Sequence, residues 1–197
     1  MKVVIMARGT KELIYRGALE AFAELGFTGT SMDLIAEKSG VVKRTLYYNF
    51  QTKEELFAYV MKRGIDELTT LLDHTLKEEV AFHKKWENVV QAHLHYYQEN
   101  TYLFHLLIQQ MWKRTSTDGL SIQQLFRGYF ERLDLELSRD KERGDLEKDL
   151  DVFTLSASLF GLITIPAARS LLNGQAVNLE AKQTTIRTLI LQILGGK

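Results

Sequence analysis

The sequence contains no cysteine and only one proline among its 197 residues. Without cysteine the protein cannot form a disulfide, a thiolate metal site or a cysteine nucleophile, and this is typical of the reducing cytoplasm. A proline inside a helix costs about 3 kcal/mol, so its scarcity permits long helices. The chain has no uninterrupted apolar run of about 18 residues, so we expect a cytoplasmic protein without a transmembrane helix.

Motifs typical of catalysis are missing as well. The sequence has no glycine-rich phosphate loop, no Gly-x-Ser-x-Gly and no His-Glu-x-x-His. His93 and His95 are two positions apart, so they point to different sides of a helix and favour no metal site. We therefore expect no enzyme, no cofactor and no bound metal. A helical enzyme with a vestigial DNA module is the alternative that these absences disfavour.

The charge balance gives no sign of a nucleic-acid ligand when the chain is taken as a whole. It has 25 Lys and Arg against 25 Asp and Glu, a net charge of zero. However, no acidic residue lies between Glu37 and Glu54, and that stretch holds four cations: Lys38, Lys43, Arg44 and Lys53. A local cluster of cations is what contacts to DNA phosphates require.

Apolar residues recur every three or four positions along most of the chain, which predicts an all-α fold of about nine helices. Thr30 is expected to cap the second helix, and Thr52 with Glu55 forms a capping box before the fourth. Pro166 is expected to kink or end a helix. The predicted helices are 10–25, 31–39, 43–49, a long helix from Thr52, 84–99, 101–114, 119–139, 149–173 and 178–194.

The second and third predicted helices have the spacing of a helix-turn-helix unit. Gly40 lies at the turn, and Leu46 is placed to anchor the second helix from its inner face. In such a unit the second helix enters the major groove, where Arg and Lys suit guanine or phosphate and tyrosine hydroxyls suit phosphate. Small three-helix modules that only pack share this pattern, so by itself it leaves DNA binding open.

From Thr10 to Val60 the chain resembles the N-terminal domain of the TetR (tetracycline-repressor) family of bacterial transcriptional regulators. Three positions depart from the family pattern: Val42 replaces a frequent helix-capping serine, Arg44 a frequent glycine and Asn49 a common histidine. The matching segments are 21–27, 30–36, Gly40-Val41, Lys43, 45–48, Phe50 and 53–56.

This resemblance implies a sequence-specific DNA-binding transcriptional regulator, expected to be a repressor that a small-molecule effector releases from its operator. It implies a helix-turn-helix DNA-binding domain over 1–52 and a helical ligand-binding and dimerisation domain over 53–197. We add Arg44 as a base-contacting residue. The residues implied to contact double-stranded DNA are Thr30 or Ser31, Lys43, Thr45, Tyr47, Tyr48 and Lys53.

The two last predicted helices, 149–173 and 178–194, favour a homodimer. The first is apolar almost all round, so every side of it needs to be covered. Pairing with the same helices of a second copy would form an isologous four-helix interface and place two recognition helices on a palindromic operator. A monomer core built from the same apolar stripes is the alternative.

The middle helices are rich in aromatic residues, which favours either core packing or a pocket for a small apolar or aromatic effector. A regulator of the same fold without a small-molecule effector, controlled by a protein partner, remains the alternative. The candidate lining residues are Trp86, His93, Tyr97, Phe104, Gln109, Trp112, Tyr129 and Arg169.

Overall fold

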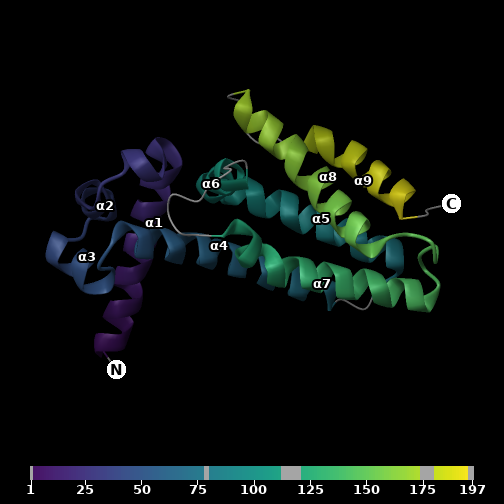
Figure 1. Ribbon diagram of the computed structural model, residues 1–197, viewed down its shortest axis with the longest axis horizontal. Coiled ribbons are helices and arrows are strands. Elements are labelled where there is room, and N and C mark those ends of the chain that lie inside the picture. Colours follow the sequence, from purple (N-terminus) through teal and green to yellow (C-terminus); the bar gives the residue numbers. More distant parts are fainter. Residues whose placement is uncertain (1, 78–79, 112–120, 174–179, 195–197) are drawn as a thin grey trace. The chain divides into compact units, whose positions relative to one another are not determined.

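The computed structural model describes residues 2–77, 80–111, 121–173 and 180–194 (Figure 1). All regular structure in these ranges is helical, which confirms the predicted all-α fold. The helices are α1 (Lys2–Gly29), α2 (Met32–Ser39), α3 (Lys43–Asn49), α4 (Lys53–Leu76), α5 (Phe82–Glu99), α6 (Thr101–Met111), α7 (Ile122–Arg143), α8 (Val152–Leu172) and α9 (Glu180–Ile193).

The chain forms two compact units, and the division between them lies inside α4. The first unit comprises Met1–Gly64 together with Tyr102–Ile122, and the second comprises Ile65–Thr101 together with Gln123–Lys197. The predicted boundary at residue 52 precedes α4, whereas the compact units divide within this helix. Helix α6 belongs to the first unit, although sequence order alone places it among the later helices.

In the first unit, α1 and α2 approach each other at Gly17. A Cβ atom on Gly17 would lie 2.6 Å from the backbone nitrogen of Ser39 and 2.8 Å from its Cα, and would also meet its hydroxyl. Only glycine fits here, because the obstacle is backbone and not a flexible side chain. After Ser39 the chain turns at Gly40, whose φ of 64° is left-handed and ends α2 as predicted.

The connection between α1 and α2 corrects one prediction. Ser31, not Thr30, caps α2: its hydroxyl accepts from the Leu34 N–H at 3.1 Å. Thr30 is buried, and its hydroxyl donates to the carbonyls of Ala21 at 3.0 Å and Gly26 at 2.7 Å. Two hydroxyls are adjacent in the sequence, and the one that faces α1 satisfies carbonyls freed near Gly26, where the helical backbone is interrupted.

The Thr52 half of the predicted capping box before α4 is confirmed, whereas the Glu55 carboxylate accepts from the Gln51 N–H instead of the Thr52 N–H. The Glu55 N–H donates to the Thr52 hydroxyl at 3.1 Å, and the Glu55 carboxylate accepts from the Gln51 N–H at 2.7 Å. These contacts satisfy backbone donors that a helix start otherwise leaves open. They fix the residue at which the chain leaves α3 and enters the long helix.

In the second unit α5, α8 and α9 pack against one another (Figure 1). Helix α8 continues through Pro166 to Leu172, so the proline does not end it. Its segment Val152–Leu171 is long and apolar enough to cross a membrane. Polar residues such as Thr154, Ser158 and Thr164 interrupt the segment, so it contains no uninterrupted apolar run of about 18 residues. Leu155, Leu159 and Ile163 of this helix are buried in the second unit.

Candidate DNA-binding surface and effector core

Helix α3 is held by one buried side chain and presents the rest of its surface to solvent. Leu46 is fully buried, whereas Tyr47 is 47% and Tyr48 is 90% exposed. Val42 occupies the N-cap position without a side-chain hydrogen bond, and its carbonyl accepts from the Thr45 and Leu46 N–H groups. The missing cap lowers helix stability by about 1 kcal/mol in typical hosts.

Most of the residues predicted to contact DNA lie on one exposed surface of α2 and α3. Lys43, Arg44, Tyr47 and Tyr48 are exposed, and Thr45 is half-buried. Ser31 is also exposed, although its hydroxyl caps α2. We call this set, Ser31, Lys43, Arg44, Thr45, Tyr47 and Tyr48, the α3 surface.

The two remaining residues of the predicted DNA-contacting set, Thr30 and Lys53, form hydrogen bonds within the first unit. The burial of Thr30 removes its side chain from the DNA-contacting set. The Lys53 ammonium donates to the carbonyls of Phe27 at 2.7 Å and Thr30 at 2.8 Å, and lies 4.4 Å from the centre of the Phe27 ring. Lys53 therefore ties the start of α4 to the end of α1.

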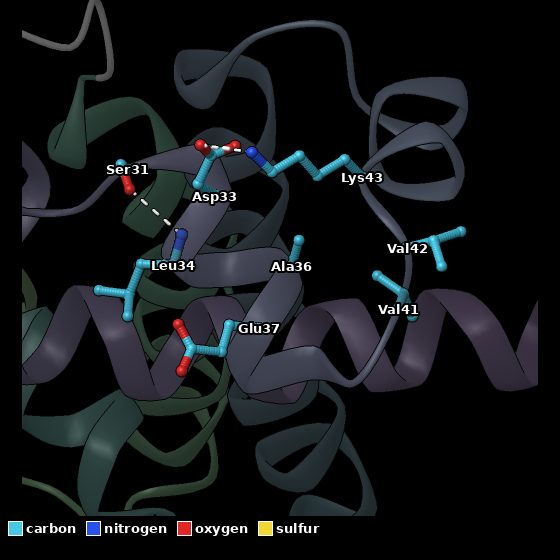
Figure 2. A pocket seen from close by; sticks show the side chains of 8 residues that line it. All are labelled: Ser31, Asp33, Leu34, Ala36, Glu37, Val41, Val42 and Lys43. Carbon is cyan, nitrogen blue, oxygen red and sulfur yellow. Dashed lines mark hydrogen bonds and ion pairs between the residues drawn. The ribbon is translucent and has the colours of Figure 1, made fainter.

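The cations of the acid-free stretch have specific partners. Lys38 pairs with Glu20 at 2.5 Å and Glu24 at 3.0 Å, both on α1. Lys43 of α3 pairs with Asp33 of α2 at 2.7 Å, across an open groove between the two helices (Figure 2). The formal positive charge of this stretch is thus partly neutralised by acids that are distant in the sequence.

The second unit encloses a small apolar cavity. Its volume is about 10 Å³, close to that of one water-sized sphere. Helices α5, α7, α8 and α9 all contribute to its wall. The lining residues are Trp86, Val89, Val90, Tyr129, Leu133, Leu159, Phe160, Ile163 and Ile190.

Two buried hydrogen-bonded groups lie beside this cavity. The His93 Nδ1 lies 2.7 Å from the Val89 carbonyl, which only accepts, so Nδ1 carries the proton. The His93 Nε2 then accepts from the Tyr129 hydroxyl at 2.8 Å. The hydroxyls of Tyr97 and Thr164 lie 3.2 Å apart. Burial raises the pKa of Tyr97 to about 12 and lowers that of His93 to about 4, so both side chains are neutral at physiological pH.

A further buried polar group, which was not predicted from the sequence, lies next to Trp86. The Lys85 ammonium pairs with Glu136 at 2.6 Å and Asp140 at 2.5 Å, and the Trp86 Nε1 donates to Asp140 at 3.0 Å. Burial alone would raise the pKa of Glu136, but the Lys85 ammonium holds it below its ordinary value. The spacing of Glu136 and Asp140 with the buried Leu133 and Leu137 on one face of α7 was the available signal.

The structure brings together only some of the predicted effector-binding residues. Trp86 and Tyr129 line the cavity, His93 bonds Tyr129, and Tyr97 bonds Thr164 in a separate buried pair. Phe104 and Gln109 lie on α6, which belongs to the first unit. Arg169 is exposed, and Trp112 lies outside the described residues.

The depressed pKa of His93 predicts an acid-sensitive fold. The unfolded chain takes up a proton near pH 6.5, whereas the folded protein does so only near pH 4, so stability falls as the pH decreases through this range. From pH 7 to pH 5 the free energy of unfolding should fall by about 2 kcal/mol from this residue. Urea unfolding at pH 7 and at pH 5 measures this change in the free energy of unfolding. His93→Gln should remove this drop, and His95→Gln, on the exposed side of the same helix, should retain it. Equal pH dependence in the two variants would contradict the assignment.

Comparisons with known proteins agree with this geometry. Residues 14–60 match the family described as bacterial regulatory proteins, tetR family, and residues 61–193 match the YsiA-like protein, C-terminal region. The fatty acid metabolism regulator protein of Bacillus subtilis (strain 168) is 24% identical over 186 residues, which cover 93% of this chain and 95% of that protein.

Two solved structures share the fold. The transcriptional regulator FadR from Bacillus subtilis, in complex with stearoyl-CoA, superposes with a TM-score of 0.82 at 22% identity over 95% of this chain and 99% of that one. FadR from Bacillus halodurans, a fatty acid degradation regulator, gives 0.82 at 20% identity with the same coverage. The predicted helix-turn-helix regulator is thereby confirmed: the chain belongs to the tetR family of DNA-binding bacterial transcriptional regulators.

Proposed function

We propose that this regulator is a dimeric repressor in the bacterial cytoplasm that leaves a palindromic operator when a fatty acyl-CoA or a similar apolar effector binds its second unit. The observation that supports the effector most directly is the similarity, over 95% of the chain, to the FadR structure that contains stearoyl-CoA, together with the apolar lining of the small cavity between α5, α7, α8 and α9. In this proposal the effector favours a spacing of the two α3 helices that no longer fits the operator.

The α3 surface is the proposed DNA interface, with Arg44 as the base-contacting residue. Arg44 is exposed near the N-terminus of α3, the end that meets base edges in helix-turn-helix proteins. A bidentate arginine contact to guanine discriminates against other bases by about 1–3 kcal/mol. Tyr47 and Tyr48 are placed to donate to phosphates.

Replacement of Arg44 separates base contact from phosphate contact. Arg44→Ala should weaken operator binding by about tenfold or more, and binding to mixed-sequence DNA far less, because a base contact acts only at the operator. Fluorescence anisotropy with both duplexes at one salt concentration measures the two affinities. Equal losses on both duplexes would assign Arg44 to a phosphate instead.

The exposed face of α8 and α9 supports the dimer. Phe153 is 76% and Ile165 is 46% exposed, and Ala157 lies between them on the same stripe of α8. Leu189 and Ile193 extend the apolar surface on α9. Less than half of the apolar segment Val152–Leu171 is buried within the chain, so a second copy has apolar surface to cover.

A charge placed on this face should separate the dimer. Leu189→Glu should give a monomer at micromolar concentration, because an interfacial carboxylate without a partner is costly to bury. Leu135→Glu is the matched control, since Leu135 is similarly exposed on α7, at 48% against 41% for Leu189. Sedimentation velocity measures the oligomeric state of both variants. A dimer in the Leu189 variant, or a monomer in the control, would count against this interface.

The effector proposal requires the core to open. A cavity of about 10 Å³ cannot hold an acyl chain, so α8 or α9 would have to move relative to α5 and α7. The wall is aliphatic and aromatic, which suits a long hydrocarbon chain. The FadR structure with stearoyl-CoA supports this class of effector for the present chain.

A larger side chain in the cavity tests the effector class. Leu159→Phe should fill the site and weaken stearoyl-CoA binding at least tenfold, while Leu135→Phe on the exposed face of α7 should not. Saturation with ligand at about 100 times its Kd stabilises a protein by about 2.7 kcal/mol, so thermal melts report binding. Coenzyme A alone should give a much smaller shift. Equal stearoyl-CoA binding by both variants would place the acyl chain elsewhere.

The small size of the cavity supports a second candidate, a regulator of this fold that a protein partner controls without any small-molecule effector. In that case neither stearoyl-CoA nor a shorter acyl-CoA would shift the melting temperature of the unmodified protein. The same melts therefore distinguish the two candidates.

A further inference from the structure

We propose that Asp33 is a specificity-determining residue, which neutralises Lys43 on the α3 surface and so suppresses binding to non-operator DNA. The ammonium of Lys43 on α3 lies 2.7 Å from the carboxylate of Asp33 on α2, so this ion pair links the two helices of the helix-turn-helix unit (Figure 2). Both side chains are exposed, at 64% for Lys43 and 61% for Asp33.

The pair is too exposed to serve stability. Exposed ion pairs contribute about 0–1 kcal/mol, so a DNA phosphate can displace the carboxylate from Lys43 without a large penalty. The carboxylate nevertheless stays at the first turn of α2, next to the same phosphates, and repels them. The local charge of the pair is zero whether or not Lys43 changes partner.

This neutralisation acts on the sequence-independent part of the affinity. Each phosphate that a cation neutralises adds about 0.9 to the slope of log K against log salt concentration. Of the other cations in the acid-free stretch, Lys38 is paired with two glutamates and Lys53 is held by two carbonyls. Arg44 therefore becomes the main uncompensated cation on the α3 surface, and it is also the proposed base-contacting residue.

The position of Asp33 differs from that of the other acid in the groove. Glu37 is exposed one turn further along α2 and lines the same groove. Among the described contacts, however, the ion-pair partner of Lys43 is Asp33. Glu37 thus offers a matched control, because its neutralisation changes the charge of the same helix without releasing Lys43.

The test uses the full chain and a labelled mixed-sequence DNA duplex between about 50 and 200 mM KCl. Asp33→Asn should steepen the slope of log K against log salt by about 0.9 per protomer, and tighten non-specific binding by about tenfold at the lower salt. Glu37→Gln should give less than half of either change. In a Lys43→Met background, Asp33→Asn should have less than half of its effect on the slope, because only the repulsion between the carboxylate and the phosphates is removed.

Three results would overturn the proposal: equal effects of Asp33→Asn and Glu37→Gln, an undiminished effect in the Lys43→Met background, or weaker binding by Asp33→Asn. The last result would show that Asp33 positions Lys43 for DNA or itself contacts a base. Thermal melts confirm that each variant is folded, and Asp33→Ser, which keeps a polar side chain in the first turn of α2, repeats the test if the asparagine variant unfolds.

Discussion

The DNA-binding unit depends on the close approach of Gly17 to Ser39. Because a side chain on Gly17 would collide with the backbone of α2, this contact sets how near α2 lies to α1. The position of α2 then sets Gly40, whose left-handed turn directs the chain into α3. Leu46 is the one residue of α3 that is fully buried, so the orientation of the exposed side chains of the α3 surface follows from the packing of α1 and α2. Gly17 thus determines the placement of the α3 surface without being part of that surface.

In the second unit, two of the aromatic residues that line the cavity, Trp86 and Tyr129, have a polar group, and each uses it in a buried hydrogen bond. Trp86 donates to Asp140, and Tyr129 donates to His93. Buried hydrogen bonds of this kind are costly to break without replacement, so these rings resist displacement. The aliphatic side chains on the α8 and α9 side of the wall have no polar group, but two contacts tie their helices to α5: the hydroxyls of Tyr97 and Thr164 are 3.2 Å apart, and Arg187 pairs with Glu87 at 2.7 Å. An enlargement of the cavity on that side would have to break or rearrange these two contacts.

The sequence was sufficient to predict the fold and the exposed side of α3, because both depend on local periodicity and on turn residues such as Gly40. It was not sufficient where two similar groups compete for one role: Thr30 and Ser31 both offer a hydroxyl, and only the direction of α1 decides which one caps α2. Pairs between distant residues, such as Lys43 with Asp33, were also missed, since charge counts along the chain do not show which ions meet. The α6 residues that were predicted to line an effector pocket were grouped with those of α5, because the order of the helices does not reveal which unit each one belongs to.

The buried group formed by Lys85, Glu136 and Asp140 restricts how this protein can change over evolutionary time. Loss of Lys85 would leave two buried carboxylates without their cation, which typically destabilises a protein by about 3–5 kcal/mol, whereas joint replacement of all three residues by apolar ones is often neutral. Single substitutions of Lys85 are therefore expected to be purged, while loss of either carboxylate leaves the other one paired with Lys85. Related chains that keep Lys85 should keep at least one of the two acids, and where Asp140 is lost the indole of Trp86 would need another acceptor.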